Sequence, residues 1–290
     1  MNVAPARRDD FLALMLENYG AAMSAQEFDW WFDANPAGPR IVNEARDDDG
    51  TPLGVLAMSG AAMSGGLSVF AVHAVTTPAA RGRGVFSALE YHNEEEAARA
   101  GAAWALGFTN PMAGPILVDK LGWEDVCSLR IWVRPKRPRK RGSGGLRVPA
   151  SCPPFEPRHE TSFDAQHIVR DVGYLDWRYA HSPREYLRID GDRGWVVVSH
   201  SVWHGYSSAV ICDAVGHGLP SLLRRCAGAV DADVAVAMVN PGEEGSYLAA
   251  GFFPTQRKIR FIGKRITDAA PELPKARKAW RFSLGDLDFF

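Results

Sequence analysis

The chain of 290 residues has few cysteines, no long apolar run and almost no net charge. Its four cysteines are scattered without a C-x-x-C pair, which argues against a disulfide framework and a thiolate zinc site. No stretch approaches about 20 consecutive apolar residues, so no transmembrane helix is expected. The start, MNVAPARRDD, lacks the apolar core of a secretory signal. A net charge of −1 gives no sign of a nucleic-acid or membrane partner. These absences predict a cytoplasmic protein.

Residues 134–157 differ in composition from the rest of the chain. They are rich in proline and glycine, and seven Lys or Arg residues lie between Arg134 and Arg147. This composition predicts a mobile linker between a domain at 1–133 and a domain at 158–290. The basic block either keeps a tether soluble or attracts an anionic ligand, such as the phosphates of a cofactor.

Two landmarks recur in the same order in the two halves of the chain. The pattern D-W-x-aromatic-x-x-x-P occupies residues 29–36 and 176–183. An Asn-Pro pair that leads to Gly followed by an aromatic residue occupies 110–123 and 240–252. The shared order predicts an internal duplication. The alternative is that both halves merely share common strand and turn chemistry.

The hydrophobic patterns predict a mixed α/β sheet in each half. In the first half, strands are expected at 40–45, 53–62, 67–75 and 103–108, and helices at 11–23, 85–101 and 115–121. In the second half, strands are expected from 188 or 194 to 202, at 207–214 and at 234–239, and helices at 219–229 and 243–250. Strands that alternate with helices, with antiparallel hairpins early in each half, give this fold class.

The sequence Arg81-Gly82-Arg83-Gly84 lies between a predicted strand and a predicted helix. Its two glycines can adopt backbone conformations closed to other residues, and they allow the chain to approach a ligand closely. The amides at the start of the helix have no intrahelical acceptors, and the helix dipole is positive there. The two arginines add positive charge and fixed donors for phosphate oxygens. This turn is therefore predicted to hold a pyrophosphate.

Together with the preceding Thr-x-Pro, a later strand that ends in Asn and the sequence Lys-Leu-Gly-Trp, this loop resembles the GNAT superfamily of acyl-CoA-dependent N-acyltransferases. The resemblance covers about residues 40–125. It implies that an R-x-x-G-x-G/A loop after the fourth strand binds the pyrophosphate of coenzyme A. Arg81, Gly84 and Phe86 occupy that pattern, and Phe86 departs from the usual small residue.

The resemblance also assigns the remaining contacts to the acyl donor. It implies that the thioester arm pairs with the strand edge at Ala74–Thr76. The later family segment matches at Asn110 and at residues 120–123, whereas Val118 replaces a tyrosine that often protonates the departing thiolate. The residues expected to bind acetyl-CoA or another acyl-CoA are Ala74, Val75, Thr76, Arg81, Gly82, Arg83, Gly84, Val85, Phe86, Asn110 and Lys120.

The second half resembles the same fold without the loop. Residues 213–221, which correspond to the loop region, contain glycines but no arginine. The resemblance therefore implies two GNAT-like domains in tandem, of which one binds the cofactor and the other is a degenerate copy that shapes the substrate cleft. The aromatic C-terminus, residues 280–290, is expected to dock on the folded body.

Acylation of an amine requires a neutral nucleophile, and an alkyl ammonium group has a pKa near 10. His73, on the strand that enters the loop, is the first candidate for the general base, and Glu44 is the second. The alternative for His73 is a structural, hydrogen-bonded histidine. His200 and His204 are four residues apart in a β-like segment, so no metal site is expected. Glu94–Glu96 are expected to form a solvated helix face.

The sequence thus predicts an enzyme that transfers an acyl group from acyl-CoA to a primary amine of a small molecule. Direct attack in a ternary complex is expected because no cysteine lies near the loop in the sequence. Two alternatives stay open. One is a non-catalytic acyl-CoA-binding or regulatory module, and the other is an acyltransferase that uses a longer acyl chain or an acidic carrier protein docked on the basic linker.

Overall fold

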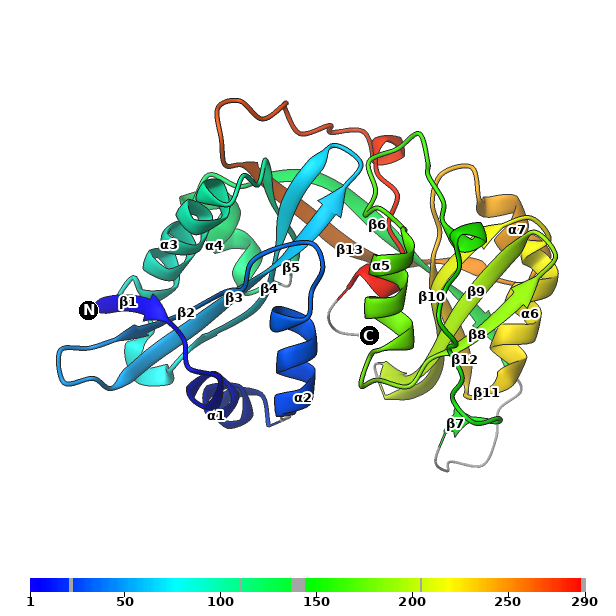
Figure 1. Ribbon diagram of the computed structural model, residues 1–290, viewed down its shortest axis with the longest axis horizontal. Coiled ribbons are helices and arrows are strands. Elements are labelled where there is room, and N and C mark those ends of the chain that lie inside the picture. The colour runs from blue at the N-terminus through cyan, green and yellow to red at the C-terminus, as the bar shows by residue number, and fades with distance from the viewer. Residues whose placement is uncertain (21–22, 110, 137–143, 204, 288–290) are drawn as a thin grey trace. The chain divides into compact units, whose positions relative to one another are not determined.

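The computed structural model describes residues 1–20, 23–109, 111–136, 144–203 and 205–287. The chain forms two compact units (Figure 1). The first unit contains Met1–Val126 and Phe261–Pro274, and the second contains Cys127–Arg260 and Lys275–Phe290. No helix among the described residues is long and apolar enough to cross a membrane.

The first unit contains a mixed sheet of consecutive strands. Their order is β1 (Asn2–Pro5), β2 (Ile41–Arg46), β3 (Pro52–Met63), β4 (Gly66–Thr76) and β5 (Trp104–Thr109). The first four pair antiparallel, and β5 pairs parallel to β4. Residues 261–265, the end of β13 (Phe253–Arg265), lie beside β5. This arrangement places the end of β4 and the start of the following helix together, as the sequence predicts.

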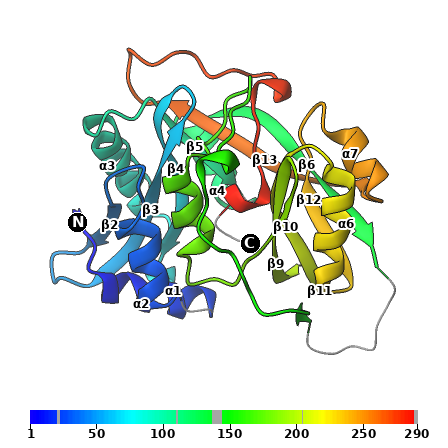
Figure 2. The same cartoon turned by 45° about the vertical axis from the view of Figure 1, so that its right-hand side comes forward.

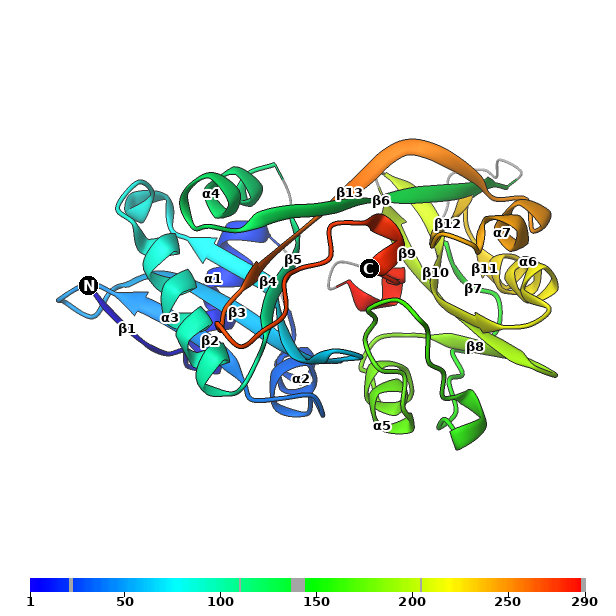
Figure 3. The same cartoon turned by 90° about the horizontal axis from the view of Figure 1, so that it is seen from above.

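Helices cover both faces of this sheet (Figure 3). The helix α1 (Arg8–Tyr19), the short helix α2 (Ala25–Phe28) and a π-type turn η1 (Asp29–Asp33) lie on one face, and α3 (Val85–Arg99) and α4 (Ala113–Lys120) lie on the other. The helix α3 buries Val85, Leu89 and Ala97 in the core, which is the spacing of an amphipathic helix. Gly101, at φ 86°, follows its C-terminus.

The second unit has the same kind of architecture (Figure 2). Its strands follow the order β6 (Glu124–Pro135), β12 (Val234–Met238), β10 (Tyr206–Gly216), β9 (Gly194–Trp203) and β8 (Leu187–Gly191), and β7 (Gly145–Leu146) pairs separately with β11 (Val230–Asp231). Its helices and turns are η3 (Pro157–His159), α5 (Val172–Leu175), η4 (Asp176–Ala180), α6 (Leu219–Ala229), α7 (Glu244–Ala249), η5 (Arg277–Ala279) and η6 (Leu284–Asp286). Residues of α6 and α7 pack into one hydrophobic core with the strands.

The two units repeat one order of elements. Each D-W motif forms a π-type turn directly after a short helix, which is N-capped by Ser24 in the first unit and by Asp171 in the second. A strand, a hairpin, a helix, a strand and a second helix then follow in both units. In each hairpin the second strand carries one extra residue, Val72 in β4 and Cys212 in β10.

The unit boundaries differ from those predicted at 133 and 157. They lie inside two strands, at Val126 in β6 and at Arg260 in β13, and residues 261–274 return to the first unit. Arg134 and Pro135 are not linker, because they pair with β12. The hydrophobic pattern does not predict β6 and β13, because charged residues interrupt the apolar residues of both strands. Residues 137–143, which hold much of the basic block, lie outside the described part of the chain.

The returning segment makes a testable contact in the first unit. A Cβ added at Gly263 would lie 2.9 Å from Leu106 Cδ2 and 3.3 Å from the Ala105 carbonyl oxygen. We expect Gly263→Ala to destabilise the protein by about 1–3 kcal/mol, because overpacking displaces β13 from β5. Gly228→Ala on α6 is the control, because no atom outside its own helix lies within 4 Å of the added Cβ. Equal melting temperatures for both variants would contradict this packing.

Candidate active site

The strands β4 and β5 separate partway along their length. They pair only from Ser68–Phe70 to Trp104–Leu106, although β4 continues to Thr76 and β5 to Thr109. The extra residue in β4, Val72, follows directly after this ladder, where a bulge bends a strand. The rings of Phe70 and Phe108 stack at 5.6 Å where the strands separate. Beyond this fork, one backbone edge of β4 is turned away from any pairing with β5.

A cavity of about 690 Å³ lies along this fork in the first unit. That volume is in the range of sites that bind small ligands and cofactors. It is lined by His73 and by most residues expected to bind acyl-CoA, namely Ala74, Val75, Thr76, Arg81, Gly82, Gly84, Val85, Phe86 and Lys120. The structure therefore brings together segments that are far apart in the sequence.

The loop between β4 and α3 has the backbone of an anion site. Gly82 and Gly84 have φ values of 77° and 78°, and nothing lies within 4 Å of a Cβ added at either position. Backbone conformation, rather than lack of space, therefore requires glycine. The first hydrogen bond of α3 runs from the Ala88 amide to the Gly84 carbonyl oxygen. The amides of residues 85–87 have no intrahelical acceptor, and they lie at the positive end of the helix.

Two predicted binding residues, Arg83 and Asn110, are not among the described residues that line the cavity, and neither is Val118. Arg83 does not line the cavity, and its amide donates to the Ala80 carbonyl oxygen at 3.3 Å. Asn110 lies outside the described residues. Val118, which replaces the family's tyrosine, packs against the core and does not line the cavity.

The two base candidates have different surroundings. His73 lines the cavity, and its ring contacts Phe11 and Phe32 edge to face, each at 6.3 Å. Glu44 does not line the cavity; its carboxylate is buried and lies 2.8 Å from the Arg46 guanidinium. Of these two, only His73 is positioned to contact a ligand in the cavity.

Tyr19 lines the cavity, whereas the sequence predicts only that it lies in the helix expected at 11–23. It is the last residue of α1, and its hydroxyl donates to the Ala74 carbonyl oxygen at 2.7 Å. It therefore joins α1 to the part of β4 beyond the fork. Its spacing from Met15 in the helix is the one sequence signal that places it on the face toward the sheet.

The inner face of α3 carries three buried polar residues. Asn93 donates to the Leu56 carbonyl oxygen at 3.0 Å. Glu94 accepts from the Trp123 indole at 2.9 Å and from Lys264 at 2.6 Å. The prediction that Glu94 is solvated was therefore wrong, because it faces the core rather than water.

Glu90 is the third residue of this face, and it lines the cavity. Its side chain is 0% exposed, and within the described ranges neither carboxyl oxygen has a hydrogen-bond partner. Burial, helped by the charge of Glu94 and opposed by Lys264, raises the pKa of Glu90 to about 8. The carboxyl group is therefore neutral at pH 7. The signal in the sequence is that Glu90 shares a helical stripe with Phe86 and Asn93.

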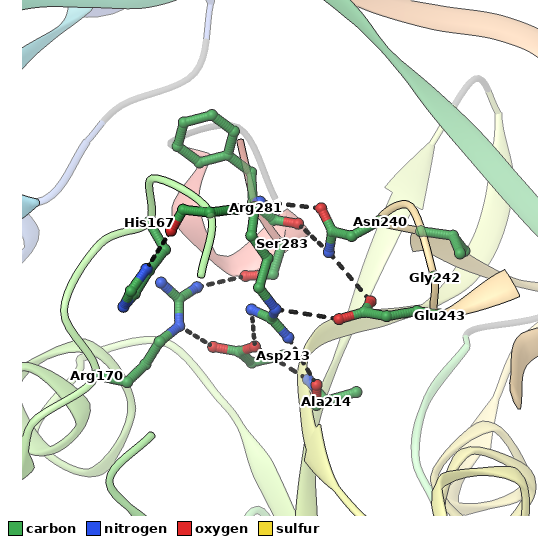
Figure 4. Close-up of polar contacts among 12 residues, drawn as sticks. His167, Arg170, Asp213, Ala214, Asn240, Gly242, Glu243, Arg281 and Ser283 are labelled. Carbon is green, nitrogen blue, oxygen red and sulfur yellow. Dashed lines mark hydrogen bonds and ion pairs between the residues drawn. The ribbon is translucent and has the colours of Figure 1, made fainter. Parts of the chain in front are cut away.

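In the second unit, the corresponding fork is filled by the chain itself (Figure 4). The strands β10 and β12 pair only from Ser208–Val210 to Val234–Val236. The Arg281 side chain donates to the Ala214 carbonyl oxygen on β10 at 3.0 Å. The backbone amide and carbonyl of Phe282 bond to the Asn240 side chain just after β12. The C-terminal segment thus contacts the end of β10 through Arg281 and the residues after β12 through Phe282.

A buried ion cluster holds this segment in place. The Arg170 guanidinium bonds to Asp213 at 3.0 Å and to Asp286 at 2.7 Å, and all three side chains are fully buried. Burial alone would raise the pKa of Asp286, but the charge and hydrogen bonds of Arg170, the Ser283 amide and the charge of Arg281 together outweigh burial and lower that pKa. Eight residues, 77–84, separate β4 from α3, whereas only residues 217 and 218 separate β10 from α6. The second unit therefore lacks the loop that carries the anion site.

The histidine pair expected not to bind a metal is only partly described. His200 Nε2 lies 2.9 Å from the Ser207 hydroxyl, within hydrogen-bond distance. His204 lies outside the described residues.

Glu90 makes stability depend on pH in a defined direction. The folded protein keeps the carboxyl protonated up to about pH 8, whereas the unfolded chain ionises near its usual pKa of 4.5. Stability is therefore lost as pH rises through this window, by up to about 1.4 kcal/mol per pH unit. We expect the melting temperature of Glu90→Gln to rise relative to wild type from pH 5 to pH 8. Glu95→Gln, at an exposed position, is the control, and a constant difference for Glu90→Gln would contradict the burial.

Comparison with known proteins identifies the fold. No protein-family model matches the sequence, and no curated protein matches it. Solved structures do match across both units. A GCN5-related N-acetyltransferase from Anabaena variabilis aligns over 92% of this chain and 73% of its own, with 12% identity and a TM-score of 0.58. Eis1 from Mycobacterium abscessus aligns over 92% and 74%, with 13% identity and a TM-score of 0.59.

A third match is a GCN5-related N-acetyltransferase from Kribbella flavida, which covers 91% of this chain and 72% of its own at 13% identity, with a TM-score of 0.59. At these identities the likeness concerns the fold alone. The chain is a mixed α/β protein with two GNAT-like domains, the fold of the GCN5-related N-acetyltransferases.

Proposed function

We propose that the chain is an acyl-CoA-dependent N-acyltransferase whose donor binds in the cavity of the first unit. The observation that carries this proposal is the fork between β4 and β5, which opens onto the helix N-terminus at Gly84. A pyrophosphate requires a positive, amide-rich turn, and an extended arm with amide groups requires a strand edge that is not paired with a neighbouring strand. The loop and β4 supply both within one cavity of about 690 Å³.

Different residues of the first unit bind the pyrophosphate and the arm of the acyl donor. The amides of residues 85–87 and the Arg81 side chain hold the pyrophosphate. The edge of Ala74–Thr76 lies alongside the arm, and its amides polarise the thioester carbonyl as negative charge develops on the oxygen. No described residue that lines the cavity is a cysteine, so transfer proceeds by direct attack of the amine rather than through an acyl-enzyme.

His73 is the group proposed to take the proton from the attacking amine. It lines the cavity one residue after the bulge, whereas Glu44 is held by Arg46 outside it. Val118 supplies no proton donor, so the departing thiolate takes its proton from another group or from water. The proposed acceptor is the primary amine of a small molecule.

The second unit is proposed to be a degenerate copy of the first. Its shortened loop and its filled fork leave one donor site per chain. The expected stoichiometry is therefore one coenzyme A per chain, and calorimetric titration measures it directly.

Binding of the donor can be tested separately from catalysis. We expect Arg81→Ala to weaken coenzyme A binding about 10- to 100-fold in isothermal titration calorimetry, because it removes a charge-assisted hydrogen bond. Arg83→Ala is the matched control, because it removes the same charge from the same turn without removing a cavity residue, and a smaller loss is expected. Unchanged affinity in Arg81→Ala would refute the site.

The role of His73 can be tested with acetyl-CoA and a panel of primary amines, by measuring thiol release. We expect His73→Asn to lower kcat by about a hundredfold or more and to abolish the acid limb of the pH profile, while coenzyme A affinity is retained. A profile like that of wild type would assign His73 to packing against Phe11 and Phe32. Binding of acetyl-CoA by wild type without turnover of any amine would favour the non-catalytic alternative.

A further inference from the structure

Glu90 has no role in the proposed transfer, although it is the buried acidic residue of the cavity wall. It lies five residues into α3, about 7.5 Å along the helix axis from Val85 and the anion site. The same cavity is also lined by apolar residues from β3 and α4, including Leu56, Ala113 and Leu117. The Glu90 carboxyl group is buried and has no hydrogen-bond partner among the described residues, so a ligand in the cavity is the polar partner left to consider.

The neighbouring polar residues show what is unusual about Glu90. Asn93 and Glu94 lie on the same helix face, and both have hydrogen-bond partners within the first unit. Glu90 has none among the described residues. A buried polar group without a partner costs free energy, and an ionised one costs more. The cavity therefore holds an unsatisfied group whose natural partner is the ligand.

The chemistry of a neutral carboxyl group defines that partner. Its O–H donates a hydrogen bond, and its carbonyl oxygen accepts one. A secondary amide has the complementary pair, a carbonyl oxygen and an N–H. The arm that joins the pyrophosphate of coenzyme A to its sulfur contains two such amides, and it starts at the anion site from which Glu90 is one and a half turns distant.

We propose that the neutral carboxyl group of Glu90 hydrogen-bonds to an amide of the acyl-donor arm, so that donor affinity falls when Glu90 ionises. This inference rests on the proposed function, because it needs coenzyme A in the same cavity. It adds a polar contact on α3, opposite the backbone edge of β4, and it makes this contact depend on pH.

The charged groups around Glu90 set the pH at which the contact is lost. Glu94 on the same helix raises the pKa of Glu90, and Lys264 from β13 lowers it, but burial dominates and the value is about 8. Arg81, Lys120, His73 and Tyr19 are the other titratable groups among the described residues that line the cavity. Since they are common to wild type and to a Glu90 variant, the ratio of the two affinities isolates Glu90.

The test is calorimetric titration of coenzyme A from pH 6.5 to pH 9.5 into wild type, Glu90→Gln and Glu95→Gln. Glutamine keeps a donor and an acceptor but cannot ionise. We expect equal affinities for wild type and Glu90→Gln within about threefold near pH 7. Above pH 8, wild type should weaken relative to Glu90→Gln by up to about tenfold per pH unit, the limit for one proton. Glu95→Gln should follow wild type throughout.

A second measurement locates the contact. The infrared carbonyl band of a protonated carboxyl group should be present at pH 7 in wild type and absent in Glu90→Gln. Coenzyme A should shift that band, whereas 3′,5′-ADP, which lacks the arm, should leave it in place. A shift with both ligands, or with neither, would overturn the contact.

The outcomes also separate this inference from the function on which it rests. If coenzyme A binds, and binding depends on Arg81, but the ratio of wild type to Glu90→Gln is constant with pH, then only the role of Glu90 is wrong. If coenzyme A binds to none of the proteins at pH 7, the proposed function and this inference both fail.

Discussion

The separation of β4 and β5 after Phe70 and Leu106 is the constraint on which the site depends. A sheet normally satisfies the backbone groups of each inner strand on both edges, and here β4 loses one partner while it keeps β3 along its whole length. The bulge at Val72 and the stacked rings of Phe70 and Phe108 lie at the point of separation. The proposed donor contacts on β4 and on the loop, from Ala74 to Gly84, lie beyond that point.

The second unit shows the same constraint with another solution. Its strands β10 and β12 also separate after three pairs, and an extra residue again follows in the second strand of the hairpin. There the C-terminal segment, residues 281–286, contacts the strand ends and is held by the buried cluster around Arg170 (Figure 4). In the second unit, the separated strands hydrogen-bond to a segment of the chain itself. This contrast supports a ligand as the occupant of the fork in the first unit.

Much of the fold and of the binding loop could be predicted from the sequence, because local chemistry determines them. The loop at Gly82 and Gly84 requires positive φ, and α3 and β4 have clear periodicity. The return of residues 261–274 to the first unit could not be predicted. The sequence of a charged strand such as β13 does not indicate which strands it pairs with. The burial of Glu90 could not be predicted for a related reason, because a glutamate on an amphipathic helix is usually solvated, and this one is buried only in the folded first unit.

The return of residues 261–274 to the first unit affects the order in which the chain folds during synthesis. Lys264, which neutralises Glu94 on α3, and Pro271, whose carbonyl oxygen accepts a hydrogen bond from the Trp104 indole, are both made after the second unit's strands. Most of the unit that carries the loop is synthesised before the second unit, but its last segment is synthesised after the second unit's strands. Its core is complete only after residues 261–274 have been made, so a product that ends before them lacks Ile262 and Ile266 of that core even though it contains every residue of the loop.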